Sequence, residues 1–192
     1  KEYFELIQHD VTEPLEYEGA IDYIIHAASN ASPKFISTDP VGIIKANTLG
    51  TMNLLELSRK KTIQNFLFLS TREIYGKSIK NSLTEQDYGG FDILSPRACY
   101  PESKRMAETL LESYAVQYKI PYTVARIAHS YGPGMEVNND GRIMSDLISN
   151  VVNSEDIILK SEGTAERAFC YLSDATTALL TVLLNGDSGQ AY

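Results

Sequence analysis

The sequence predicts an α/β fold in which helices cover both faces of a doubly wound parallel sheet. Three short apolar runs, at residues 21–28, 65–70 and 122–127, have the near-continuous hydrophobic character of strands buried on both faces. Two longer segments with helical periodicity, at residues 40–61 and 100–119, separate these runs. This alternation is typical of parallel sheets, because a helix returns the chain between neighbouring strands.

Signals at the helix ends support this alternation. Asp39 followed by Pro40 predicts a helix start, because a capping side chain and a proline at the first helical position both favour one. Pro121 follows the second helix and marks its end. We expect five residues to form the inner face of the first helix: Val41, Ile44, Thr48, Met52 and Leu55.

The remaining segments are shorter. Residues 3–8 are predicted as a further strand, and Gly132-Pro133-Gly134 breaks the alternation of strands and helices. The stretch that follows resembles an inserted lobe with a helix at 142–152 and a short strand at 156–160. The chain therefore divides into a partial sheet domain, a small substrate lobe, and a return segment with a last helix and the start of a strand: 1–131, 132–166 and 167–192.

Composition excludes several classes of function. A net charge of −8 argues against a broad nucleic-acid-binding surface, so we expect no nucleic-acid partner. No apolar run reaches the roughly 18 residues of a membrane span and no signal peptide is visible, so we expect no membrane contact. Cys99 and Cys170 have no metal-ligand spacing and make no disulfide framework, which indicates a reduced, cytoplasmic protein without a metal site.

Polar residues gather at the predicted carboxyl ends of the strands, where ligands bind in doubly wound sheets. The first strand ends in His26-Ala27-Ala28-Ser29, whose small residues let a flat ring approach the backbone. The second ends in Ser70-Thr71-Arg72-Glu73, and the third in His129-Ser130-Tyr131-Gly132. Tyr100 and Lys104 open the helix between the second and third strands, so we expect them at the same edge of the sheet.

Tyr100 and Lys104 share one face of their helix, because residues four positions apart lie one above the other. An ammonium group beside a phenol favours the phenolate and lowers a pKa that starts at about 10. A phenolate near neutrality can accept a proton from a sugar hydroxyl while a hydride leaves the carbon. The spacing alone also arises by chance, so the position of the pair at the strand ends carries the prediction.

These residues and their neighbours resemble the extended short-chain dehydrogenase/reductases that remodel nucleotide sugars, a family with a Rossmann-like fold. The resemblance covers nearly the whole chain and rests on six motifs in the family's order: His26-Ala27-Ala28-Ser29, Asn47 to Asn53, Ser70-Thr71 before Tyr75-Gly76, Tyr100-x-x-x-Lys104, Tyr131-Gly132-Pro133, and Arg167 to Asp174. Within the family, four further segments are similar to UDP-glucuronate decarboxylases: residues 9–15, 31–33, 96–100 and 139–142. The dTDP-glucose 4,6-dehydratases are the next most similar group.

The resemblance implies NAD-dependent modification of a nucleotide sugar, above all decarboxylation of UDP-glucuronate through a 4-keto intermediate. Tyr100 would be the base that oxidises the sugar C4 hydroxyl, and Lys104 would lower its pKa and bind the nicotinamide ribose. Thr71 would hydrogen-bond the same hydroxyl, and Glu73 would be a working carboxylate. The family also implies a homodimer packed through the two long helices.

Other positions are expected to contact NAD or the substrate by the same resemblance. Asn47 would bridge the backbone to a catalytic water or fill a polar slot in its helix. The positions expected along NAD, besides Tyr100 and Lys104, are Asp10, Val11, Ala27, Ala28, Ser29, Asn47 and Ser70. The positions expected to contact the nucleotide sugar are Arg72, His129, Arg142 and Arg167.

Three departures from the family pattern change these expectations. The family's glycine-rich phosphate loop would precede Lys1 and occurs nowhere in the sequence, so we expect a fragment, incomplete at both ends, that binds NAD poorly or not at all. Arg72 stands where decarboxylases have serine and dehydratases have aspartate, and a guanidinium there could hold a substrate carboxylate. His129 replaces an asparagine that the family places beside the substrate.

Two alternatives to decarboxylation remain open at this point. One lies in the same class, a nucleotide-sugar 4-epimerase or 4,6-dehydratase, although the missing aspartate at Arg72 disfavours the dehydratase. The other is a non-catalytic relative, in which Arg72 and His129 mark a decayed sugar pocket and the fold serves binding or assembly. Turnover of a nucleotide sugar by the full-length protein separates the two classes.

Overall fold

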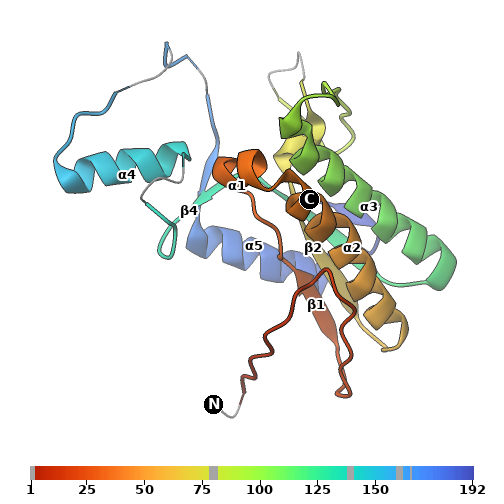
Figure 1. Cartoon of the computed structure of the whole chain (residues 1–192). Helices are drawn as coiled ribbons and strands as arrows, with labels where there is room; N and C mark the ends of the chain where they lie inside the picture. Colours follow the sequence, from red (N-terminus) through yellow and green to blue (C-terminus); the bar gives the residue numbers. More distant parts are fainter. Residues whose placement is uncertain (1–2, 78–81, 138–140, 159–161, 165) are drawn as a thin grey trace.

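A computed structural model of the chain describes residues 3–77, 82–137, 141–158, 162–164 and 166–192. Its centre is a four-stranded sheet in which all neighbouring strands are parallel (Figure 1). In spatial order the strands are β1 (Tyr23–His26), β2 (Asn65–Thr71), β3 (Tyr122–Ile127) and β6 (Gln190–Ala191). The predicted doubly wound, Rossmann-like α/β fold is therefore confirmed.

Helices cover both faces of this sheet. On one face, α2 (Pro40–Arg59) and α3 (Cys99–Tyr118) pack against each other and bury Phe66 and Phe68 of β2 (Figure 1). On the other face, α5 (Leu172–Asn185) packs against β2 and β3 and buries Leu67 of β2. Successive residues of β2 thus enter two different cores, which explains its near-continuous apolar sequence.

The first strand differs from the prediction of burial on both faces. Its residues alternate, so that Ile24 and His26 are buried while Tyr23 and Ile25 are exposed. The cause lies in the coverage of the sheet, because α5 packs against β2 and β3. An apolar run in the sequence therefore does not by itself reveal whether a helix covers each face.

Helix α2 begins as predicted but buries a different face. Asp39 caps it, and its Oδ1 accepts a hydrogen bond from the Gly42 backbone N–H at 3.0 Å. The buried row includes Asn47 and Thr51, whereas most of the predicted inner stripe is exposed or partly exposed and Leu55 alone is fully buried. The hydrophobic pattern predicted the wrong face because two polar residues, Asn47 and Thr51, are buried in this helix. Each donates a hydrogen bond there: Asn47 to Ser103 Oγ and Thr51 to the Asn47 carbonyl.

Residues 3–8 do not form the predicted strand. They run without regular hydrogen bonding, and the Tyr3 side chain is 95% exposed. A strand requires a neighbour for its ladder, and within the described part of the chain none lies beside this segment. The structure also contains three short helices. They are α1 (Pro33–Thr38) between β1 and α2, η1 (Arg72–Tyr75) directly after β2, and η2 (Pro96–Ala98) directly before α3.

The segment after β3 forms a second, smaller unit. Strands β4 (His129–Tyr131) and β5 (Phe169–Tyr171) pair in parallel as a separate two-stranded sheet. Helix α4 (Ile143–Asn153) extends away from the main sheet, as Figure 1 shows. Of the predicted strand at 156–160, residues 156–158 are irregular and the rest lie outside the described residues. No helix in the described ranges combines the length and apolarity that a membrane crossing requires.

Candidate active site

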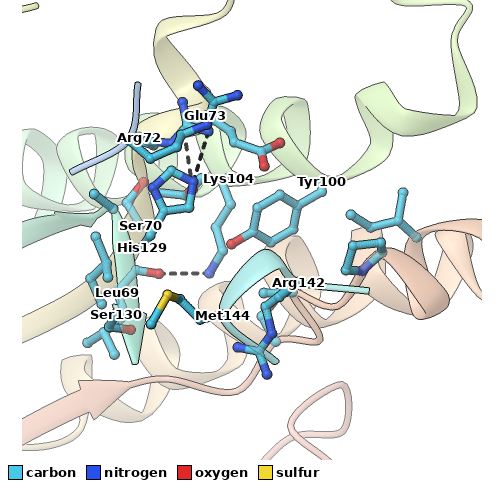
Figure 2. A pocket seen from close by; sticks show the side chains of 18 of the residues that line it. Leu69, Ser70, Arg72, Glu73, Tyr100, Lys104, His129, Ser130, Arg142 and Met144 are labelled. Carbon is cyan, nitrogen blue, oxygen red and sulfur yellow. Dashed lines mark hydrogen bonds between the residues drawn. The ribbon is translucent and has the colours of Figure 1, made fainter. Parts of the chain in front are cut away.

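A cavity of about 470 Å³ lies at the carboxyl ends of the parallel strands, the position that the fold predicts. Its walls come from the segments after β1 and β2, the start of α3, β4, α4 and the segment before β5 (Figure 2). Eleven of the predicted site residues line it: Ala27, Ser29, Ser70, Thr71, Arg72, Glu73, Tyr100, Lys104, His129, Arg142 and Arg167. The chain thus brings together residues from positions 27 to 167.

The tyrosine and the lysine lie together on one side of this cavity. Tyr100 is 7% exposed and Lys104 is 3% exposed, since the first turn of α3 is held against the ends of β2 and α1. Lys104 Nζ donates a hydrogen bond of 2.7 Å to the Leu69 carbonyl and points past the Tyr100 hydroxyl (Figure 2). It also lies 4.6 Å from the ring centroid of Phe68, which contributes to its desolvation.

Burial dominates the electrostatics of this pair. Desolvation raises the pKa of Tyr100, and a hydrogen bond with Thr71 pulls that pKa back towards its ordinary value. Desolvation also lowers the pKa of Lys104 to about 7, although the nearby Glu108 carboxylate opposes the shift. In this structure burial therefore raises the pKa of Tyr100, and the side chains that act on this pKa are Thr71, Glu73 and Arg97. The lowering of the pKa by Lys104 stays a prediction.

Glu73 is paired with an arginine that sequence analysis did not single out. Arg97 Nη2 lies 2.8 Å from Glu73 Oε1 and also lines the cavity. Arg97 precedes Tyr100 by three residues. Its position just before the start of α3 is the sequence feature that could have identified it as a site residue. The pairing orients the Glu73 carboxylate and satisfies part of its charge.

Arg72 and His129 meet across the cavity wall (Figure 2). Arg72 Nη2 is 3.3 Å from His129 Nε2, and His129 Nδ1 is 3.3 Å from the Ala168 carbonyl oxygen. Partial burial and then the Arg72 charge lower the pKa of His129 below its ordinary value. The two residues that depart from the family pattern therefore contact each other.

A buried network lies beneath the strand ends and supports the site. Ser70 Oγ donates a 2.5 Å hydrogen bond to Glu108 Oε1, and Arg126 Nη2 lies 2.8 Å from Glu108 Oε2. Arg126 Nη1 also donates to the Tyr75 hydroxyl at 3.2 Å. Arg105 donates to the carbonyl of Ile74, the residue after Glu73 in η1. These contacts from α3 and β3 fix the segment that presents Arg72 and Glu73.

Four predicted cofactor positions lie outside this cavity. Ala28 is exposed, and Asp10 is exposed with its Oδ1 accepting two hydrogen bonds from Thr12. Val11 contacts α2 at Gly50, and its carbonyl accepts a hydrogen bond from Asn53 Nδ2 at 3.0 Å. Asn47 is buried with Nδ2 donating to Ser103 Oγ. Sequence analysis in turn missed the apolar lining: Ile36, Met135, Ile143, Met144 and Phe169.

The donors and acceptors around Lys104 fit the ribose end of a nicotinamide cofactor. An ammonium group has three donors, and the Leu69 carbonyl accepts one of them. Ser29 Oγ is buried at the cavity rim, and no described residue partners it. A ribose diol would supply the missing partners. A glycine-rich turn that could cradle a pyrophosphate does not occur in the sequence, so the described fit concerns one end of the cofactor.

The fold and the cavity define an α/β protein of the dinucleotide-binding type, with a buried tyrosine–lysine pair at its ligand edge. The chain belongs to the NAD dependent epimerase/dehydratase family, whose family model matches residues 3–192. The resemblance inferred from the sequence motifs is therefore confirmed.

Individual relatives refine this placement. The chain is 42% identical to UDP-glucuronic acid decarboxylase 6 of Arabidopsis thaliana, over 96% of this chain and 52% of the relative. It is 40% identical to UDP-glucuronic acid decarboxylase 1 of Xenopus tropicalis, over 95% of this chain and 42% of the relative. The structure of UDP-glucose 4-epimerase from Thermotoga maritima with UDP-glucose matches with a TM-score of 0.79 and 28% identity, covering 89% of this chain and 54% of that one. The chain thus spans about half the length of the curated relatives it matches.

Proposed function

We propose that the protein is an NAD-dependent enzyme that decarboxylates UDP-glucuronate through a 4-keto intermediate. The observation that carries this proposal is the buried group of Tyr100, Lys104 and Thr71 beside a cavity rich in arginine. The sequence similarity to UDP-glucuronic acid decarboxylases supports the choice of substrate.

The charge of the cavity opposes that of the whole chain. The chain carries a net charge of −8, yet the described lining has a single carboxylate, Glu73. The basic side chains that line the cavity are Arg72, Arg97, Lys104, Arg142 and Arg167. Such a cavity favours a ligand with several negative charges, as a nucleoside diphosphate joined to a sugar acid has.

The chemistry follows from the position of the tyrosine. Tyr100 would take the proton of the sugar C4 hydroxyl, while Thr71 would hold that hydroxyl in place. Bound NAD would accept the hydride from C4 and later return it. A ketone at C4 makes the C6 carboxylate part of a β-keto acid, which loses CO₂ and leaves a carbanion stabilised as the enolate. Protonation at C5 and return of the hydride then give the UDP-pentose.

The segment that carries α4 would hold the substrate. We propose that residues 1–131 and 167–192 build the cofactor-binding part and that residues 132–166 form a substrate lobe. Arg142 and Met144 of this lobe line the cavity, which supports the assignment (Figure 2). The two free cysteines, Cys99 and Cys170, are consistent with the reducing cytoplasm that we propose as its location.

The test supplies NAD and UDP-glucuronate to the protein expressed from its complete reading frame. We expect release of CO₂ and formation of a UDP-pentose, measured by mass spectrometry. Tyr100→Phe keeps the buried ring and removes the hydroxyl, so turnover should fall by at least about 10²-fold with unchanged circular dichroism. Turnover that survives in Tyr100→Phe would refute the base. Tight binding of nucleotide sugars without any turnover would favour a non-catalytic binding protein.

We further propose that the protein is a homodimer packed through α2 and α3. A largely apolar groove runs between these helices on their outer side. Its apolar side chains include Pro40, Ile44, Ile93, Leu94 and Met106, and Glu102 is the one carboxylate in its lining. Met106 is 50% exposed, and Ile44 and Met52 of α2 are also exposed. A second copy of this face would cover these side chains and remove their apolar surface from water.

A further inference from the structure

The hydrogen bonds around His129 define which form of its ring is present. A carbonyl oxygen can only accept, so His129 Nδ1 must carry the proton that it shares with Ala168. A guanidinium can only donate, so His129 Nε2 must present its lone pair to Arg72. Both contacts are satisfied by the neutral ring protonated at Nδ1. The charged groups that act on His129 are Arg72 and Glu73 of η1 and Arg167.

Arg72 is a cation without an acidic partner among the described residues. Its hydrogen bond to the neutral His129 ring uses one of five N–H donors. The adjacent carboxylate, Glu73, is engaged by Arg97 at 2.8 Å. The remaining donors of Arg72 line the cavity and can form a bidentate pair with an incoming carboxylate.

The place of Arg72 in the cavity relates it to the reacting carbon. It directly follows Thr71, which lines the cavity with Tyr100 and acts on the pKa of the Tyr100 hydroxyl. A sugar whose C4 hydroxyl lies between Thr71 and Tyr100 has its C6 carboxyl two bonds further on, attached to C5. Because Arg72, Thr71 and Tyr100 all line this one cavity, the carboxyl group of a sugar bound there can come within reach of the Arg72 guanidinium.

We propose that Arg72, positioned by the neutral His129 ring, binds the sugar carboxylate and selects an acidic nucleotide sugar over its neutral counterpart. Arg72 is the specificity-determining residue, and His129 acts through it as a positioning residue. This inference rests on the proposed nucleotide-sugar function. It adds an explanation of how the chain distinguishes a uronic acid from a hexose. The distinction is made by Arg72 and His129, the two residues that depart from the family pattern.

The matched ligands UDP-glucuronate and UDP-glucose test the role of Arg72, because they differ only at C6. Dissociation constants are measured by calorimetry with NAD and the full-length protein in a Tyr100→Phe background, so that UDP-glucuronate is not consumed. Arg72→Gln should raise the dissociation constant of UDP-glucuronate by about tenfold or more. The dissociation constant of UDP-glucose should change by less than about twofold. An equal loss for both ligands, or no loss for either, would overturn the proposal. Arg72 is exposed, so thermal denaturation should be unchanged in the variant.

Two substitutions of His129 separate its two contacts. His129→Gln can place an acceptor near the position of Nε2 and keep the contact with Arg72. His129→Asn can keep a donor near Nδ1 for Ala168, but its acceptor oxygen does not reach the position of Nε2. We expect His129→Asn to lower the preference for UDP-glucuronate over UDP-glucose by several fold and His129→Gln to retain most of it. The opposite order, or equal effects, would remove the positioning role.

The same measurements keep this inference separate from the proposed function. If the wild-type protein binds UDP-glucuronate more tightly than UDP-glucose but releases no CO₂, decarboxylation fails while the selection by Arg72 stands. If CO₂ is released and the preference survives Arg72→Gln, the selection fails while the decarboxylation stands. Arg142→Gln is the matched comparison, since this arginine lines the same cavity but is not among the charges that act on His129, and it should affect both ligands alike.

Discussion

At the scale of single residues, Lys104 is a cation buried by the fold at an electrostatic cost. Its ammonium group is almost fully buried and has one described acceptor, the Leu69 carbonyl. Burying a cation without a full set of partners is unfavourable, and this cost appears as a pKa lowered to about 7. The fold thus keeps an unfavourably buried amino group at the place where we propose that a cofactor binds.

This burial predicts a specific dependence of stability on pH. The lysine pKa is 10.5 in its ordinary state and about 7 in the fold, so between these values the unfolded chain binds more protons. The free energy of unfolding should therefore rise with pH in this window, by up to about 1.4 kcal/mol per pH unit. Lys104→Met should remove this rise, as measured by urea denaturation between pH 7 and 9.5.

A matched control is available on α2. Lys45 is exposed, and Lys45→Met should leave the slope of stability against pH unchanged. The prediction fails if Lys104→Met and the wild type keep the same slope. Stability of Lys104→Met at pH 7 should equal or exceed that of the wild type, because the substitution removes a buried charge.

The residues also show what a sequence can and cannot reveal about a site. The positions of Tyr100, Lys104 and Thr71 were predictable, because strand ends and helix starts meet at one edge of a parallel sheet. The direction of the pKa shifts of Tyr100 and Lys104 was not predictable, since desolvation depends on how closely α3 packs on the sheet. The contact between Arg72 and His129 joins residues 57 positions apart, and no local pattern announces it.

At the scale of elements, α3 and β3 are joined beneath the site by a buried ion pair. Arg126 and Glu108 are only 10% and 16% exposed in their side chains, and Glu108 also accepts the hydrogen bond of Ser70. Removing one partner of such a pair leaves the other charge buried without compensation. Glu108 therefore ties β3, through Arg126, and the end of β2, through Ser70, to the helix that carries Tyr100.

We expect Glu108→Gln to lower the free energy of unfolding by about 3 kcal/mol, measured by urea denaturation. Combining it with Arg126→Met should recover part of this loss, because the double variant leaves no unpaired charge. Glu16→Gln is the control, since the ion pair of Glu16 with Lys60 is exposed and its loss should change stability little. Equal effects of Glu108→Gln and Glu16→Gln would contradict the structural role given to the buried pair.

The elements themselves were mostly predictable from periodicity and end signals. The long helices and three of the sheet strands lie within a few residues of their predicted positions, because local capping and apolar runs encode them. The buried face of α2 was not predictable, since Asn47 and Thr51 donate hydrogen bonds to Ser103 and to the Asn47 carbonyl, which hydrophobicity does not register. The strand predicted at residues 3–8 failed because a strand depends on a neighbour that the local sequence does not specify.

At the scale of the whole molecule, charge and apolar surface are separated. The chain is acidic overall, whereas the cavity lining is basic and the groove on α2 and α3 is apolar. A basic cavity in an acidic molecule concentrates anionic ligands at one place. The apolar groove lies on the outer side of α3, the helix that presents Tyr100 to the cavity. A dimer through this face would therefore stabilise the helix that carries the site.

The proposed dimer can be tested by placing a charge in this groove. Met106→Lys puts an ammonium group into this groove, where a partner would bury it. The one carboxylate that lines the groove, Glu102, is already paired with Arg105, so the complex should dissociate. Sedimentation velocity should then give half of the wild-type mass, with unchanged circular dichroism because Met106 is half exposed in one copy. Val152→Lys adds the same charge on α4, where the side chain is exposed and away from the groove, and should sediment as the wild type does. A wild-type protein that sediments as a monomer, or a Met106→Lys variant that keeps the wild-type mass, would exclude this face as the interface.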